Sequence, residues 1–347
     1  MTALPRSAIL LAGGLGTRLD PITRHRPKGL IPVGRCTILE IQLAWLRAQG
    51  VEQVVLAVSH MADRIQRALG NGSRFGIELQ YADEETPLGT GGATRNAAAL
   101  LPHGPVLVVN GDLLLDTDLT PIADLHVKIG AEATIGLVAA QRPHGFGVIG
   151  LEADGRVAWW REPTDTEKRR AALQVAVSNA DWDLVNAGVY LLEPEAIARA
   201  ASAGPVSLER TVLPEVIRSR SGMAAAALVG YWRDIGSPAS LLAASRDLAS
   251  GRIQTRCPAL VRDAEQTEGA DVDMQTLLGE GAIVEAGAVV RASMLLENSR
   301  VGAGAVVENA IIDAGAVVMP GSHFGSDQEA APACLAAGEQ FPAPQSP

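Results

Sequence analysis

Over the first 250 residues, short apolar runs alternate with longer stretches in which hydrophobic residues recur every three or four positions. The short runs predict buried strands, and the periodic stretches predict amphipathic helices that cover them. This alternation is typical of an α/β fold in which helices flank a mainly parallel sheet. The expected strands are 7–12, 54–58, 77–82 and 106–109, and the expected helices are 38–49, 62–69 and 94–101.

From about residue 281 the hydrophobic pattern changes to a period of six. An aliphatic residue occupies every sixth position, and a small residue stands two positions before it. The aliphatic row comprises Ile283, Val289, Leu295, Val301 and Val307. The row then shifts by one position and continues at Val306, Ile312 and Val318. This hexapeptide repeat predicts a short left-handed parallel β-helix over residues 256–325. The segment 326–347, which is rich in Ala and Pro, is expected to be disordered.

Composition and charge narrow the class of protein. The 347 residues suffice for two domains, and the formal net charge of -10 argues against a nucleic-acid partner because no basic face is there to neutralise a phosphate backbone. No apolar run approaches the roughly 20 residues that a bilayer span needs, so we expect a cytoplasmic protein with no membrane partner. Cys36, Cys257 and Cys334 have neither zinc nor disulfide-framework spacing and are expected to be free thiols.

The strongest chemical signal is a glycine-rich segment, residues 13–19, directly after the first predicted strand. Its three glycines let backbone N–H groups approach an oligophosphate, and Arg18 and Lys28 add two positive charges. It is neither a P-loop nor a dinucleotide fingerprint, because no Gly-Lys-Ser/Thr closes it and Leu19 replaces the third glycine. Ligands gather at the carboxyl ends of parallel strands, so residues 87–92 and 110–112 are expected to share its crevice.

The glycine loop together with Pro27-Lys28-Gly29 resembles the signature of the nucleoside diphosphate-sugar pyrophosphorylases, the sugar-1-phosphate nucleotidylyltransferases. The Leu-Gly-Thr-Gly-Gly-Ala turn at 88–93 and the appended hexapeptide repeat resemble the mannose-1-phosphate guanylyltransferase branch. The resemblance implies a Rossmann-like mixed, mainly parallel sheet with flanking helices. It assigns residues 1–255 to nucleotide and sugar phosphate binding. The implied reaction joins a nucleoside triphosphate and a sugar 1-phosphate, most simply GTP and mannose 1-phosphate, and releases pyrophosphate.

The resemblance also implies roles for individual residues. The implied catalytic residues are Arg18, Lys28 and Asp112. The implied nucleotide-binding residues are Leu11, Ala12, Gly13, Gly14, Gly16, Thr17, Arg18, Leu88, Gly89, Thr90 and Gly111. Asp112 and Asp234 would be ligands of a Mg²⁺ cofactor, which binds through one or two carboxylates plus substrate phosphates. Ser237 is the better cap for the helix that follows, which leaves Asp234 for the metal.

On the sugar side, the resemblance implies that Gly147, Glu162 and Asn186 bind the sugar phosphate, because a neutral amide such as Asn186 suits a hydroxylated ring. The lysine that the family uses for the sugar phosphate is missing, and Arg161 or Lys168 is expected to replace it. Arg and Lys bind phosphates differently, so this replacement bears on the substrate.

Two further features on the nucleotide side bear on substrate recognition. Gly29 departs from the family's Pro-Lys-Pro and is expected to loosen the loop. A carboxylate of Glu84 or Glu85 would accept the N1 and N2 protons of guanine.

Several alternatives stay open. Heptose-1-phosphate guanylyltransferases and glucose-1-phosphate thymidylyl- or uridylyltransferases share these motifs. The missing lysine and the altered Pro-Lys-Gly would favour a non-catalytic subunit that binds a nucleotide sugar and regulates a partner. A hexapeptide acyltransferase needs long coils and a catalytic base, and His323 is the only histidine in the region. The basic residues Arg24, His25 and Arg26 are expected to be a solvated loop. The β-helix is expected to join copies of the chain into a homo-oligomer.

Overall fold

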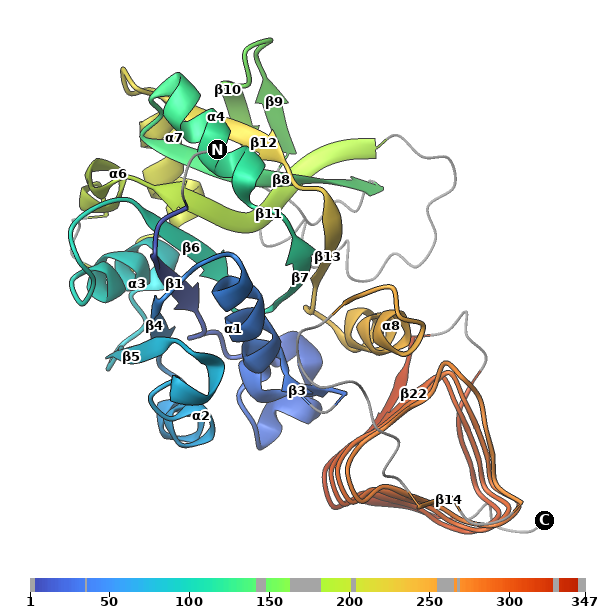
Figure 1. Cartoon of the computed structure of the whole chain (residues 1–347). Helices are drawn as coiled ribbons and strands as arrows, with labels where there is room; N and C mark the ends of the chain where they lie inside the picture. Colours follow the sequence, from blue (N-terminus) through green and yellow to red (C-terminus); the bar gives the residue numbers. More distant parts are fainter. Residues whose placement is uncertain are drawn as a thin grey trace.

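The computed structural model describes residues 4–34, 36–141, 148–162, 182–200, 204–254, 265–266, 269–326 and 331–342. An α/β part comes first, and a triangular coil of short strands follows it, with α8 (Pro238–Ala249) lying between the two (Figure 1). No helix in the described part of the chain is long and apolar enough to cross a membrane.

A nine-stranded sheet forms the centre of the α/β part. Its strands are β1 (Ser7–Leu11), β4 (Gln53–Val58), β5 (Glu78–Asp83), β6 (Val106–Asn110), β8 (Ala133–Gln141), β9 (Val148–Leu151), β10 (Val157–Arg161), β11 (Trp182–Leu192) and β12 (Met223–Ala227). Strands β6, β1, β4 and β5 are parallel neighbours, whereas β11 runs antiparallel to both β6 and β8. The prediction of a mixed α/β sheet is therefore confirmed.

Helices cover both faces of this sheet because neighbouring residues of its strands point to opposite sides. They are α1 (Ile38–Ala48), α2 (Ala62–Leu69), α3 (Gly89–Ala98), α4 (Thr120–Ile129), α6 (Pro194–Ala198) and α7 (Leu213–Ile217). Leu10 of β1 packs in a cluster with α1, α2 and α4, whereas Ile9 packs in a second cluster with α3, α6 and α7. The predicted helices 38–49 and 62–69 are confirmed.

Helix α3 begins at Gly89, five residues before the predicted start at 94. The glycines that were expected to form a turn lie in its first turn, where Gly91 and Gly92 donate their N–H groups to the Val206 carbonyl at 2.7 and 3.3 Å. A Cβ at Gly91 would lie 3.1 Å from that carbonyl oxygen. The prediction failed because it treated these glycines as turn formers, whereas they allow a close backbone approach.

Short elements complete the α/β part. They are the single turns η1 (Thr17–Leu19), η2 (Ile22–Arg24), η3 (Lys28–Leu30), η4 (Ser73–Phe75) and η5 (Leu208–Val212), the pair β2 (Pro32–Val33) and β3 (Cys36–Thr37), and the pair β7 (Leu113–Thr117) and β13 (Gly230–Asp234). Turns η1 to η3 lie between β1 and α1, so the chain makes three tight turns at the carboxyl end of β1.

The C-terminal part is a parallel β-helix of the hexapeptide type, as predicted. Its first sheet contains β14 (Glu265–Gln266), β17 (Ile283–Val284), β20 (Arg300–Val301), β23 (Val317–Val318) and β26 (Gln340–Phe341). Its second contains β15 (Asp271–Val272), β18 (Val289–Arg291), β21 (Val306–Glu308) and β24 (His323–Gly325). Its third contains β16 (Leu277–Leu278), β19 (Met294–Leu295), β22 (Ala310–Ile312) and β25 (Ala333–Leu335).

The strict period of six is wrong for part of the predicted row. Ile283 pairs with Arg300 and Arg300 with Val317, so a coil spans 17 residues rather than 18. The buried row is Val284, Val290, Leu295, Val301, Val307, Ile312 and Val318. One step in three is five residues long and passes through Ala292 or Asn309, both with a φ of 46°. Ile283 and Val289 are consequently only half-buried.

The expectation of a disordered segment at 326–347 is also wrong for the described residues there. Strands β25 and β26 continue the β-helix, with Leu335 buried inside it. The rings of Phe324 and Phe341 meet edge to face with centroids 4.9 Å apart. Composition suggested disorder, but these apolar side chains complete the last coil.

Candidate active site

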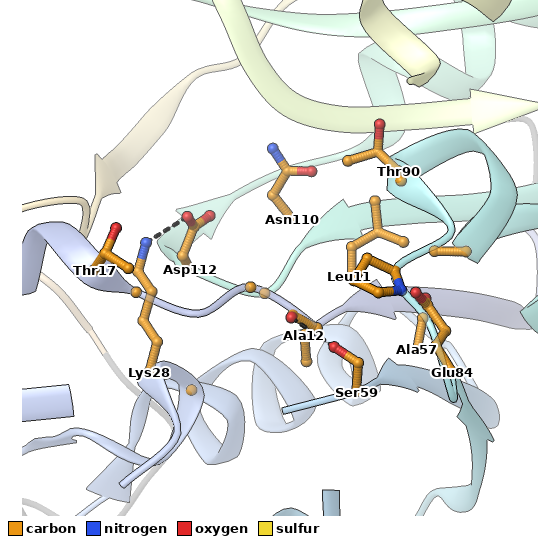
Figure 2. Close-up of a pocket in the computed structure, with 18 of the residues that line it drawn as sticks. Leu11, Ala12, Thr17, Lys28, Ala57, Ser59, Glu84, Thr90, Asn110 and Asp112 are labelled. Carbon is orange, nitrogen blue, oxygen red and sulfur yellow. Dashed lines mark hydrogen bonds and ion pairs between the residues drawn. The ribbon is translucent and has the colours of Figure 1, made fainter. Parts of the chain in front are cut away.

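A cavity of about 420 Å³ opens at the carboxyl ends of β1, β4 and β6 (Figure 2). It brings together most of the residues expected at the nucleotide and catalytic sites. These are Leu11, Ala12, Gly13, Gly14, Gly16, Thr17, Arg18, Lys28, Gly89, Thr90, Gly111 and Asp112. In Figure 2, Lys28 and Asp112 point toward one another at one end, and Glu84 and Thr90 lie at the other.

Hydrogen bonds from neighbouring side chains fix the position of the glycine loop. Ser59 Oγ donates to the Gly13 carbonyl at 2.8 Å, and Thr23 Oγ1 donates to the Gly16 carbonyl at 3.0 Å. Gly16 has a φ of 66°, and a Cβ there would lie 3.2 Å from Lys28 Cβ. Only glycine fits both the left-handed backbone and this close approach. The loop is therefore fixed against the segment that carries Lys28.

Lys28 and Asp112 form the central ion pair of the site. Lys28 Nζ lies 2.6 Å from Asp112 Oδ2, and the two side chains are 12% and 30% exposed. Asp112 follows Gly111, whose N–H donates to the Leu11 carbonyl at 3.0 Å and whose Cβ, if present, would lie 2.7 Å from that oxygen. The buried Gln42 donates to the Asn110 carbonyl at 2.8 Å. These two hydrogen bonds, with Leu11 and with Gln42, fix the backbone just before Asp112.

Gly29 does not loosen the lysine segment. Lys28 lies in turn η3, in which the Ile31 N–H donates to the Lys28 carbonyl at 3.0 Å. A Cβ at Gly29 would lie 2.6 Å from the Leu39 side chain of α1. The glycine lets the turn pack directly on α1, so the departure from Pro-Lys-Pro leaves a well-supported turn.

Asp234 and Arg18 lie next to Asp112. Strand β13 pairs antiparallel with β7, so Asp234 stands opposite Leu113, and the Ile235 N–H donates to the Asp112 carbonyl at 2.9 Å. A Cβ at Gly236 would lie 2.6 Å from Asp234 Oδ2 and 2.9 Å from Arg18 Nη2. The two expected metal ligands therefore lie at neighbouring ends of the paired strands, Asp112 directly before β7 and Asp234 at the end of β13, where Asp234 is beside the guanidinium of Arg18.

The donor set suits a divalent cation that arrives with a triphosphate. Among the described residues, no group of three or more His, Cys, Asp or Glu side chains forms a metal cage. Two carboxylates, Asp112 and Asp234, would fit Mg²⁺, which binds through one or two carboxylates when substrate phosphates and water supply its other ligands. Ser237 caps α8 and accepts from the Ser240 N–H at 3.2 Å, as the sequence predicted.

Glu84 lies at the opposite end of the cavity from Lys28. Its Oε2 accepts from the Leu88 N–H at 2.9 Å, and burial raises the pKa of its carboxyl, an effect that this hydrogen bond partly opposes. Glu85 is exposed and is not among the lining residues. Leu88 does not line the cavity either, but its backbone orients Glu84. Of the two glutamates, the structure brings Glu84 to the site.

Glu209 accepts hydrogen bonds from three hydroxyl groups, one of them that of Thr90. The sequence analysis did not select this carboxylate. Glu209 Oε2 accepts from the hydroxyls of Thr90 and Ser207, each at 2.9 Å, and Oε1 accepts from Tyr190 at 3.0 Å. Burial, followed by the nearby Glu209 charge, raises the pKa of the Tyr190 hydroxyl well above its ordinary value. This network connects the cavity to strand β11.

Asn186 belongs to the same network but does not line the cavity. Its Nδ2 donates to the Tyr190 hydroxyl at 2.8 Å, and its Oδ1 accepts from the Gly188 N–H at 2.7 Å. The pairing register of β11 shifts between Asn186 and Tyr190. In this state the amide supports an irregularity of the strand.

The remaining sugar-side residues are spread more widely. Glu162 accepts from Trp160 Nε1 at 3.2 Å, and its charge contributes to the raised pKa of Tyr190, so it lies near that hydroxyl. Arg161 is exposed at the end of β10. Gly147 and Lys168 lie outside the described residues.

Several residues at the site were missed from the sequence. Ser59 directly follows β4, so the rule that ligands gather at the carboxyl ends of strands would have found it, as it found Asn110 at the end of β6. Gly236 and Gln42 carry no local signal, because their roles depend on packing between distant segments.

Two family models match the chain. The nucleotidyl transferase model matches residues 7–251, and the GlmU-like C-terminal hexapeptide model matches residues 243–336. The chain is 33% identical to the mannose-1-phosphate guanylyltransferase of Mycobacterium tuberculosis over 86% of this chain and 82% of that protein. It is 31% identical to the mannose-1-phosphate guanylyltransferase catalytic subunit beta of Drosophila melanogaster, over 79% and 71%. It is 28% identical to a UTP–glucose-1-phosphate uridylyltransferase of Synechocystis, over 86% and 84%.

Proposed function

Because the chain belongs to the nucleotidyl transferase family, as its glycine loop predicted, we propose that it transfers a nucleotidyl group from a nucleoside triphosphate to a sugar 1-phosphate. The first pair of substrates is GTP and mannose 1-phosphate, and the products are GDP-mannose and pyrophosphate. The names of several similar proteins support this pair. The observation that carries the proposal is the contact of Lys28 with Asp112 beside the glycine loop.

The chemistry needs no nucleophile from the protein. A phosphate oxygen of the sugar 1-phosphate is already anionic near neutral pH, and it attacks the α-phosphorus in line while pyrophosphate leaves. Catalysis then consists of bringing two anions together and stabilising charge on the transferring group. Lys28 would hold the α-phosphoryl oxygens, and Arg18 would hold the departing pyrophosphate, helped by backbone N–H groups of the loop.

A Mg²⁺ ion, when bound by Asp112 and Asp234, would neutralise charge on the triphosphate. Without substrate, the Lys28 ammonium already balances the Asp112 charge. Arrival of the triphosphate with its cation would give both groups new partners. The proposal therefore predicts that cation and nucleotide bind together rather than the cation alone.

Glu84 supports guanine as the base. Its carboxylate faces the cavity from the end opposite Lys28, where a base would lie when the phosphates occupy the loop. One carboxylate can accept both the N1 and N2 protons of guanine. Uracil and thymine have no such pair of donors, so this contact would separate GTP from UTP and dTTP.

The network around Glu209 supports a neutral, hydroxylated sugar. Hydroxyls of Thr90 and Tyr190 and the Asn186 amide lie along it, and each of these groups both donates and accepts hydrogen bonds. Arg161, at the end of β10, would meet the sugar phosphate in place of the missing lysine.

Pyrophosphate release tests the proposal. Purified protein with Mg²⁺ is offered four nucleoside triphosphates against a panel of sugar 1-phosphates, beside an Asp112→Asn variant. Release with GTP and mannose 1-phosphate that the variant loses supports the proposal, and release with another pair corrects the substrates. No release with any pair, together with calorimetric binding of a nucleotide sugar, would contradict it and favour a regulatory subunit.

We also propose that the β-helix joins copies of the chain. Val289 and Val306 are half-buried neighbours on the outer side of its second sheet, a surface that a second copy can cover. Light scattering of the intact chain should give a dimer or larger, and Val306→Glu should lower the mass. A monomer at all concentrations would contradict this.

A further inference from the structure

The basic residues 24–26 were expected to form a solvated loop, and Arg24 and His25 are exposed, but Arg26 contacts an acidic corner of the β-helix. Arg26 Nη2 lies 3.4 Å from both Glu297 Oε2 and Asp313 Oδ1. The Arg26 side chain is 17% exposed, and that of Asp313 is 2% exposed. Glu297 and Asp313 lie on neighbouring coils, since Leu295 pairs with Ile312. One arginine from the α/β part thus bridges two coils of the C-terminal part.

Asp313 is a fixed partner for this arginine. Its Oδ1 accepts from the Ala314 N–H at 2.7 Å, and its own N–H donates to the Leu335 carbonyl of the last coil at 3.0 Å. A buried carboxylate that loses its cation is strongly destabilising. Arg26 is therefore held by a group that cannot easily move away.

An apolar cluster links the turns next to this segment with the β-helix. Leu19 and Ile22, in turns η1 and η2, are buried in one cluster with residues of α8 and of the β-helix. The β-helix members of this cluster are Leu277, Met294, Leu296 and Ile311. The turns around the glycine loop and the β-helix therefore share one apolar core.

These contacts reach the catalytic residues through very short connections. Only Pro27 separates Arg26 from Lys28, and proline fixes its own φ angle. Thr23 bonds the Gly16 carbonyl, and Gly16 in turn packs against the Lys28 side chain. A shift of the segment on the β-helix would therefore move both the lysine and the glycine loop.

We propose that Arg26 is a positioning residue for nucleotidyl transfer, and that its ion pairs with Glu297 and Asp313 make the β-helix a support of the active site. The pairs hold the segment 26–28 so that the Lys28 ammonium meets the transferring phosphoryl group. This inference rests on the proposed function for its kinetic consequence. Misplacement of a catalytic group by about 1 Å can cost about 100-fold in rate.

Steady-state kinetics of Arg26→Ala, Arg26→Lys and Asp313→Asn, with the best substrate pair, test the inference. Arg26→Ala should lower kcat by about 10- to 100-fold and change the KM of the nucleotide less, because Ser59 still holds the glycine loop at the Gly13 carbonyl. Arg26→Lys should restore much of kcat. Asp313→Asn should also lower kcat. The double variant of Arg26→Ala and Asp313→Asn should lose less in kcat than the product of the two single fold-losses.

Arg291→Ala is the matched control, because Arg291 forms an ion pair with Asp271 within the β-helix, away from the glycine loop. It should leave kcat unchanged. If Arg26→Ala loses its cooperative melting transition, Glu297→Gln replaces it, since Glu297 is 40% exposed and tolerates substitution better. A kcat within twofold of the unmodified protein for Arg26→Ala or its replacement would overturn the inference.

Hydrogen exchange gives a readout that does not depend on activity. Amides of residues 13–30 should exchange faster in Arg26→Ala than in Arg291→Ala, and unchanged exchange would overturn the inference. If the unmodified protein makes no nucleotide sugar, the proposed function fails, while the exchange result still decides whether the β-helix supports the loop.

Discussion

Lys28 shows how a single position combines sequence signal and packing. Its charge suggested a phosphate contact, and the family resemblance of the Pro27-Lys28-Gly29 segment gave it a catalytic role. Asp112 was placed in the same crevice because it follows a buried strand, and its role also came from the resemblance, but the 2.6 Å contact between the two side chains depends on the fold. The role of Gly29 was misjudged because its effect comes from the distance to Leu39, on another element.

Lys28→Ala should lower kcat by about 100- to 1000-fold, because it removes one contact that is strongest in the transition state. The melting temperature should change little, since the side chain borders an open cavity. Lys128→Ala removes an exposed lysine of α4 and is the control for net charge. Steady-state kinetics give the comparison, and equal rates for the two variants would speak against a catalytic Lys28.

Glu84→Gln should raise the KM for GTP by about 10- to 100-fold, the equivalent of one hydrogen-bonded charged group. The glutamine side chain has one oxygen and one NH2 group, so it cannot accept both the N1 and the N2 proton of guanine. A pyrimidine base makes no such pair of contacts and loses nothing. Competition between GTP and UTP in one reaction measures the change in preference. Glu85→Gln is the control, because Glu85 is exposed outside the cavity. An unchanged preference would remove Glu84 from base recognition.

At the scale of elements, the sequence predicted best where periodicity is strong and local. The helices 38–49 and 62–69 and the parallel strands were found because their apolar faces repeat regularly. Helix α3 and the 17-residue coil were misjudged for a common reason. In both, a backbone feature with no periodic hydrophobic signal decides where the element begins or steps: the contact of Gly91 with the Val206 carbonyl in α3, and the left-handed backbone of Ala292 at a corner of the coil.

The ion pair of Glu132 and Arg199 predicts a pH dependence of stability where β11 leads into α6. Arg199 Nη2 donates to Glu132 Oε2 at 2.9 Å, and this bond holds the pKa of the Glu132 carboxyl below its ordinary value of 4.5. Because the folded pKa is lowered, the stabilisation is present above the unfolded pKa and is lost as pH falls through the folded pKa.

Glu132→Gln should therefore lower the free energy of unfolding by about 1–3 kcal/mol at pH 7 and by much less near pH 3. Urea unfolding of both proteins at the two pH values measures the difference. Glu195→Gln, which changes an exposed glutamate of α6, the short helix that Arg199 follows, is the control. A difference in the free energy of unfolding between Glu132→Gln and the unmodified protein that is the same at both pH values would contradict this account.

At the scale of the whole molecule, α8 joins the two parts. Residues 243–251, which include the whole second half of α8, belong to both family matches. Arg246 of α8 donates to the Ala292 carbonyl at 2.7 Å and to Asn309 Oδ1 at 3.1 Å, both at corners of the β-helix. That arrangement, like the contact of Arg26 with Glu297, links residues far apart in sequence, and no local pattern announces it.

Arg246→Ala should destabilise the protein by about 1–3 kcal/mol, because the carbonyl of the buried Ala292 and the side-chain amide of the buried Asn309 lose this donor. It should also broaden or split the unfolding transition, since the β-helix loses an anchor on α8. Calorimetric melting measures both effects. Arg300→Ala, which breaks an exposed ion pair with Glu285, should keep a single transition near that of the unmodified protein. An identical melting curve for Arg246→Ala would show that α8 is anchored by its apolar contacts alone.

The most direct test of the central claim follows the α-phosphorus itself. GTP labelled at the α-phosphate is incubated with mannose 1-phosphate, Mg²⁺ and the intact protein, and the products are separated. Nucleotidyl transfer predicts label in GDP-mannose and an equal amount of unlabelled pyrophosphate. Label in GMP or GDP, formed at the same rate without the sugar phosphate, would contradict the account and indicate a nucleotide hydrolase.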